Sequence, residues 1–188
     1  LIDFIHDIGR VCPEHRREDF LKMLKSAGNG AVRASKKEED KDIDFDGMYS
    51  RVRDHFKSID SQEVTITAVL NEEYDDWYDD SGEEFYYEDN DDISDMLEEA
   101  CDFVHICMDR EKYKEGFAVG KQLLEMEILC DNEYGDEEFS MGDMVHYELL
   151  HCDLKRVILD IAYCTYQSVP PAKRPEALID MCNMLYQE

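Results

Sequence analysis

The spacing of apolar residues from Asp92 onward is the feature that most restricts how this chain can fold. The segments "DISDMLEEACDFVHICMDR" and "KYKEGFAVGKQLLEMEIL" repeat apolar side chains every three to four residues, which is typical of amphipathic helices. They meet at about residues 110–112 and predict a helical hairpin. Gly116 and Gly120 lie one turn apart on the second helix, and their small size predicts close packing against helix 93–109.

The helical pattern continues toward the end of the chain. An acidic turn at 131–139 separates the hairpin from "SMGDMVHYELLHCDLKRVILDIAYCTYQSV". This segment predicts one long helix of about 28 residues, which would span roughly 40 Å. Ser140 and Asp143 form a capping-box pattern at its start. A pair of prolines ends it, and Pro175 opens a last helix.

Residues 1–60 predict three helices and a polar linker. "LIDFIHDI" begins the first helix, "PEHRREDFLKMLKSAG" forms the second, and the third follows the linker. The linker, 29–42, is rich in Lys, Glu and Ser. Residues 61–91 are ambiguous, because "EVTITAVL" suits either a strand or a short helix. A Ser-Gly turn signal allows a small β-hairpin within 61–90.

Together these patterns predict a fold that is all-α or nearly so. We expect about six or seven helices, packed as hairpins in an irregular bundle or a tetratricopeptide-like array. The last four, in 92–188, are expected to form two packed antiparallel pairs. Residues 1–60, 61–91 and 92–188 are expected to form one continuous domain. The chain begins at Leu1 rather than at a methionine, so we expect it to be part of a larger protein.

Charge is distributed unevenly along the chain. Residues 1–57 hold 12 basic and 12 acidic side chains, whereas the rest of the chain holds 8 basic and 35 acidic ones. No Lys or Arg occurs between Lys57 and Arg110. Such a surface repels phosphate backbones, so we expect no direct nucleic-acid binding. The acidity either keeps the surface solvated or attracts a basic partner or a cation.

The cysteines and the apolar runs bear on the compartment. Seven cysteines without paired spacing indicate reduced, buried thiols rather than a disulfide framework, so we expect a cytoplasmic protein. No apolar run approaches the roughly 18 residues of a membrane span. No signal peptide is visible, and we expect no membrane association.

Aromatic residues are concentrated in the acidic segment between residues 74 and 87. The rings are too many for a purely solvated loop, so some must pack on the body of the protein. The remaining rings could anchor a partner while the carboxylates steer a basic protein segment toward them. Alternatively, all of them tether an acidic loop to the core. The candidate partner-binding residues are Tyr74, Trp77, Tyr78, Phe85, Tyr86 and Tyr87.

The stretch "DIDFDGMYSRVR" begins like a calcium-binding loop. Asp42, Asp44 and Asp46 alternate before Gly47, as the ligands and glycine of an EF-hand do. The twelfth position, which requires a bidentate carboxylate, is Arg53. We therefore reject a calcium site and interpret the stretch as a linker whose Asp46 caps the third helix.

A zinc site and a reactive thiol are the other candidates for chemistry. Cys101 and His105 lie four residues apart on one helix face and could converge on zinc with Cys152. We interpret them instead as residues in or beside the core. Cys12 precedes Pro13 at a predicted helix N-terminus, with basic residues behind it, which is a setting that lowers a thiol pKa. No catalytic constellation is evident, and no cofactor is expected.

Two resemblances accompany these patterns. "EKYKEGFAVGKQLLEM" resembles the second helix of a tetratricopeptide hairpin, although no second copy occurs at a 34-residue period. The order of "LIDFIHDIGRVCPEHRREDFLKML", "YDDWYDD", a hairpin, "DNEYGDEEFSMGDM" and a long helix resembles the helical region beside SWIM zinc fingers in bacterial proteins. The C-x-C and C-x-H pairs of the finger are absent. This resemblance implies an accessory helical module for protein contacts.

The predicted function is therefore a non-catalytic protein–protein interaction module of a larger intracellular protein. A thiol-based enzyme or redox-sensing domain that uses Cys12 is the alternative from a different class. Divalent-metal binding through the Asp42–Asp46 loop is the second alternative. The sequence does not indicate an oligomeric state.

Overall fold

The computed structural model describes residues 43–70, 85–132 and 137–184, together with the single residues 10, 22 and 135. The predicted linker and Cys12 lie outside these residues. So do Asp42 and three of the candidate aromatic residues, Tyr74, Trp77 and Tyr78.

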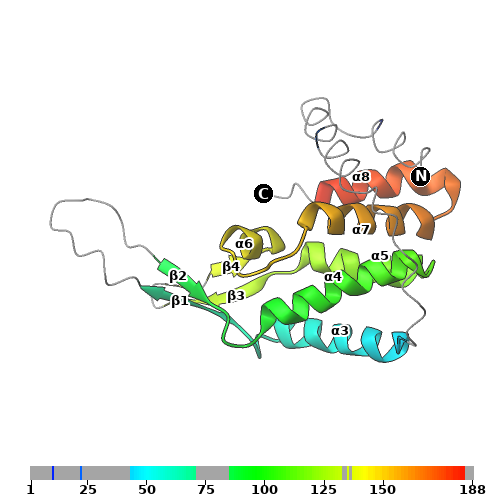
Figure 1. Cartoon of the computed structure of the whole chain (residues 1–188). Coiled ribbons are helices and arrows are strands. Elements are labelled where there is room, and N and C mark those ends of the chain that lie inside the picture. The colour runs from blue at the N-terminus through cyan, green and yellow to red at the C-terminus, as the bar shows by residue number, and fades with distance from the viewer. Residues whose placement is uncertain are drawn as a thin grey trace.

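The described residues form a helical body and a small mixed sheet (Figure 1). The helices α4, α5 and α7 pack against one another, while α3 packs on α4 and α8 packs on α7. A 3-10 turn, η2, joins α7 to α8. The bounds are α3 (Phe45–Asp60), α4 (Ile93–Asp109), α5 (Tyr113–Glu125), α6 (Met141–His146), α7 (Leu154–Ser168), η2 (Pro171–Lys173) and α8 (Arg174–Met184).

Four strands form one sheet in the order β2–β1–β3–β4. The strand β1 pairs antiparallel with β2 and parallel with β3, and β3 pairs antiparallel with β4. Their bounds are β1 (Ile66–Leu70), β2 (Phe85–Glu88), β3 (Ile128–Asp131) and β4 (Glu137–Phe139). The prediction of an all-α bundle or tetratricopeptide-like array is therefore wrong, because the fold combines helices with a mixed sheet. The hairpin allowed within 61–90 corresponds to the β1–β2 pair, which is one part of this larger sheet.

The predicted hairpin of α4 and α5 is confirmed, because α4 ends at Asp109 and α5 begins at Tyr113. The single long helix predicted after residue 139 is wrong. The chain leaves α6 at Tyr147, adopts a left-handed conformation at Glu148 (φ 59°), and starts α7 only after Asp153. The predicted capping box of α6 is present: Ser140 Oγ accepts a hydrogen bond from Asp143 N at 3.3 Å, and Ser140 N donates to Asp143 Oδ2 at 2.8 Å.

The two glycines of α5 face α7 more than the sequence indicates. A Cβ atom at Gly116 would lie 2.8 Å from Cys107 Cβ of α4 and 2.7 Å from Cys164 Sγ of α7. A Cβ atom at Gly120 would lie 2.5 Å from Ile161 Cγ1 of α7. Gly116 thus permits close packing against both helices. The three atoms nearest to a Cβ at Gly120 all belong to Ile161 of α7, a neighbour that the sequence did not indicate.

The core lies among the packed helices and extends into the near end of the sheet. The side chains of Ile66 in β1 and Ile128 in β3 are fully buried with those of the helices. Burial then decreases along β1, from Ile66 to the exposed Leu70. The largest buried side chains of the helices include Phe56, Leu97, Phe103, Leu123 and Ile161.

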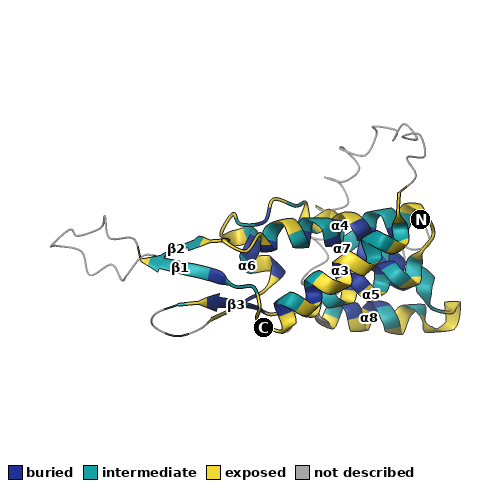
Figure 2. Cartoon of the chain, turned by 90° about the horizontal axis from the view of Figure 1, so that it is seen from below, coloured by how far each residue is buried: buried dark blue, intermediate teal, exposed yellow. Residues whose placement is uncertain are grey.

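The strands β1 and β2 project from the helical body in both views (Figures 1 and 2). We call this pair of strands the arm. Within the described ranges, no helix has the length and apolar composition needed to cross a bilayer.

Candidate functional site

The arm has two faces with different surroundings. Because side chains alternate along a strand, Tyr86 and Glu88 lie on one face of β2, opposite Val69 and Thr67 of β1. We call these four residues the outer face of the arm. Tyr86 is 48% exposed and lies next to the half-buried Val69, so about half of its surface is available. The outer face therefore combines apolar area with a carboxylate.

The opposite face attaches the arm to the body. The ring centroid of Tyr87 lies 4.9 Å from that of Phe139 and 4.4 Å from that of Tyr147. Burial, followed by the hydrogen bond with Tyr147, raises the pKa of Tyr87 to about 12, so its hydroxyl stays neutral at physiological pH. Phe85 is half-buried and lies opposite Leu70. Of the candidate aromatic residues in the arm, Tyr87 thus attaches the arm to the body and Tyr86 is exposed. Their role in binding stays a prediction.

Acidic groups at the base of the arm have structural partners. The Asp89 carboxylate accepts hydrogen bonds from Ile93 N at 2.8 Å and Ser94 N at 2.7 Å, at the start of α4. Asp91 accepts a hydrogen bond from Thr65 N at 2.9 Å. Glu88, in contrast, accepts a longer hydrogen bond, of 3.3 Å, from Asn90 and is exposed on the outer face. Of these three carboxylates, Glu88 is therefore the one best placed to meet a cation from outside the chain.

The calcium-like stretch begins a helix. Asp44 is the N-cap of α3, and its Oδ1 accepts a hydrogen bond from Gly47 N at 3.0 Å. The predicted cap, Asp46, lies instead in the first turn, where a carboxylate favours the positive end of the helix dipole. Our assignment of the cap was therefore wrong by two residues. Among the described residues, no group of three or more His, Cys, Asp or Glu side chains could hold a metal ion.

The rejected zinc residues belong to two separate contacts. Cys101 is buried in α4, and its thiol is hydrogen-bonded to Cys152, which lies in the connection between α6 and α7 rather than on a helix. Burial, followed by the neighbouring Cys152, raises the pKa of Cys101. His105 instead contacts side chains of α7. Cys101 is therefore held as a neutral, buried thiol, and His105 belongs to a polar network.

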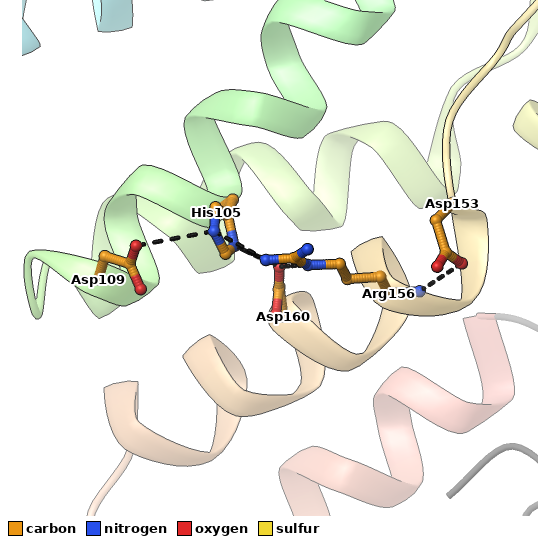
Figure 3. A network of polar contacts seen from close by, with 5 residues as sticks. All are labelled: His105, Asp109, Asp153, Arg156 and Asp160. Atoms are coloured by element: carbon orange, nitrogen blue, oxygen red, sulfur yellow. Dashed lines mark hydrogen bonds and ion pairs between the residues drawn. The ribbon is translucent and has the colours of Figure 1, made fainter. Parts of the chain in front are cut away.

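His105 is the centre of that network, which joins α4 to α7 (Figure 3). Its Nδ1 lies 3.0 Å from Asp160 Oδ2, and its Nε2 lies 3.0 Å from Nη2 of Arg156. Asp109, one turn along α4, is 3.7 Å from Nε2. Asp160 is 8% exposed and is one of the few buried polar side chains in the described part of the chain.

The roles of the two ring nitrogens depend on the protonation of His105. A neutral ring with its proton on Nδ1 donates to Asp160 and accepts from Arg156 at Nε2. In a protonated ring Nε2 is also a donor and cannot accept from Arg156, and the Asp109 carboxylate lies 3.7 Å from it. The hydrogen bond to Asp160 raises the pKa of His105, and this effect outweighs burial and the charge of Arg156. The network therefore stabilises the contact between the helices and favours the imidazolium.

Sequence reasoning placed His105 beside the core but missed its partners. Asp160 interrupts the apolar run "VILDIAY", and an acidic residue at a core position of a helix is a signal of a buried polar partner. Arg156 lies one turn before Asp160, with its Nε 4.0 Å from Asp160 Oδ2. The pattern shows that a partner is required but does not show which helix supplies it.

No protein family matches the chain, and no curated protein or solved structure is significantly similar to it.

Proposed function

We propose that this chain is a non-catalytic protein-interaction module and that the arm binds a basic segment of a protein. The observation that carries the proposal is the outer face of the arm, where a 48% exposed Tyr86 lies beside Val69 and Glu88 on a projecting pair of strands. Tyrosine supplies large contact area with only two rotatable angles, so little conformational entropy is lost when it binds.

The charge of the surrounding sequence supports a basic partner. The chain contains no Lys or Arg between Lys57 and Arg110, which includes the arm and the start of α4. Glu99 in this range is paired with Arg51 of α3, whereas Glu88 of the arm is hydrogen-bonded to the neutral Asn90. An uncompensated negative field accelerates association with a cationic segment and penalises an anionic one. The sequence resemblance to the helical region beside SWIM zinc fingers implies an accessory module for protein contacts, which agrees with this proposal.

Binding of a fluorescent hexapeptide, Lys-Thr-Val-Thr-Lys-Thr, tests the proposal by anisotropy. We expect the peptide to bind and its Glu-for-Lys counterpart to fail, with affinity falling as salt rises from about 0.05 M to about 0.5 M. Replacement Tyr86→Ala should weaken binding about tenfold or more. The matched control is Ile179→Ala, which truncates a 45% exposed residue on α8. No binding at low salt, or equal affinity for Tyr86→Ala and the unmodified chain, would overturn the proposal.

A further inference from the structure

The strand β2 is an edge of the sheet. In the order β2–β1–β3–β4, β2 pairs with β1, and no described strand lies on its other side. Alternate residues of an antiparallel edge strand direct their N–H and C=O groups away from the partner strand. Alternate backbone donors and acceptors of β2 therefore point to a side where no strand of the described ranges pairs with them.

A strand that paired with this edge would place its side chains beside the side chains of β2. Two residues of the added strand, separated by one position, would lie next to Tyr86 and Glu88 on the outer face. An aliphatic side chain would pack against the exposed ring, and a Lys or Arg would pair with the carboxylate. The edge thus favours a partner segment that is extended and that carries an apolar residue and a basic residue two positions apart.

We propose that the basic segment binds by strand addition, as a fifth strand beside β2. This inference rests on the proposed function. The backbone contacts supply binding that depends little on sequence, and the outer face supplies the selection. Charge also decides between occupants. A second copy would bring together two chains that each have a formal net charge of −27, whereas a basic segment neutralises Glu88. The four residues of β2 limit the number of backbone hydrogen bonds, so the added strand is bound reversibly.

Backbone methylation separates strand addition from simple charge attraction. Two isomers of the hexapeptide Lys-Thr-Val-Thr-Lys-Thr each carry two backbone N-methyl groups. In one isomer the methylated residues are the Val and the second Lys, and in the other they are the first and second Thr. Both keep every side chain and charge, but each loses the N–H groups on one side of the strand. We expect one isomer to bind about tenfold or more weakly and the other to bind within about twofold of the unmethylated peptide. Equal affinities of the two isomers would overturn strand addition.

A charge exchange tests the position of the basic residue. We expect Glu88→Lys to lose affinity for the Lys peptide and to gain affinity for the Glu-for-Lys peptide. Glu176→Lys, on the exposed surface of α8, changes the net charge equally and should leave the preference unchanged. Equal effects of the two variants would contradict the assigned register.

These outcomes differ from those of the proposed function. If the unmethylated peptide does not bind at all, the proposed function fails. If it binds through Tyr86 and both methylated isomers bind equally well, the proposed function stands and strand addition fails. Self-association of the chain, measured by sedimentation, that Tyr86→Ala abolishes and the peptide does not reverse would assign the edge to a second copy and overturn the basic occupant.

Discussion

His105 links an individual proton to the packing of two helices. The hydrogen bond to Asp160 raises its pKa above the ordinary value of 6.5, so the folded protein binds this proton more tightly than the unfolded chain does. A raised pKa contributes stability that is fully present below the unfolded pKa. That stability is lost as the pH rises through the folded pKa.

We therefore expect the stabilisation by His105 to depend on pH. The difference in free energy of unfolding between the unmodified protein and His105→Gln should be larger at about pH 5.5 than at about pH 8.5. Urea denaturation at both values measures it. The control is His151→Gln, which changes an exposed histidine outside the network. A difference that stays constant, or grows toward high pH, would contradict the assigned hydrogen bond with Asp160.

Individual side chains also show where sequence reasoning is sufficient. The alternation of residues in "EFYYE" places Tyr86 and Tyr87 on opposite faces once the segment is known to be a strand. The partner of His105 could not be predicted in this way, because Asp160 is 55 residues away and meets it only through the packing of α4 on α7. Residues 42–46 show a smaller effect: the three aspartates lie around the start of α3, with Asp46 inside its first turn, and which of them caps the helix depends on where it starts.

At the scale of elements, α5 depends on the absence of a side chain at Gly120. A Cβ atom there would lie 2.5 Å and 2.8 Å from the two γ-carbons of Ile161. We expect Gly120→Ala to lower the free energy of unfolding by about 1–3 kcal/mol through overpacking. This loss should exceed the gain of up to about 1 kcal/mol in helix propensity.

Thermal and urea denaturation measure this effect, and two variants control it. Lys121→Ala, at the next and exposed position, should change stability by about 0.5 kcal/mol or less. Adding Ile161→Ala removes both contacting carbons, so the two replacements should cost less together than the sum of their separate costs. A higher melting temperature for Gly120→Ala would show that α5 and α7 are not packed this closely.

The helices were more predictable than the sheet for a physical reason. The hairpin of α4 and α5 depends on local apolar spacing, and its turn was predicted within a residue. The strand β3 follows α5 after Met126 and Glu127, and its apolar residues continue the spacing of that helix, so the sequence predicts helix where the structure has a strand. Its pairing with β1 joins Ile66 to Cys130, a contact between distant parts of the sequence that no local pattern specifies. The break after α6 was missed because apolar spacing continues through Leu149 and Leu150.

Over the whole molecule, negative charge opposes folding, and under the proposed function it also attracts the basic partner. The formal net charge is −27, and all of the imbalance lies after residue 57. Self-repulsion of this size raises the free energy of the compact state. The screening length falls from about 10 Å at 0.1 M salt to about 3 Å at 1 M, so added salt relieves the repulsion between exposed carboxylates. The same screening would weaken the proposed attraction between the arm and a cationic segment.

Salt should therefore act in opposite directions on stability and on binding. We expect sodium chloride to raise the melting temperature while it lowers affinity for the Lys peptide.

Calcium and magnesium at equal concentration should raise the melting temperature equally, because screening does not distinguish them. Asp44→Ala should cost about 0.5–2 kcal/mol as a lost helix cap, by the same amount in every salt. A saturable rise with micromolar calcium that disappears in Asp44→Ala would instead establish a calcium site at the start of α3 and reverse our interpretation of that segment.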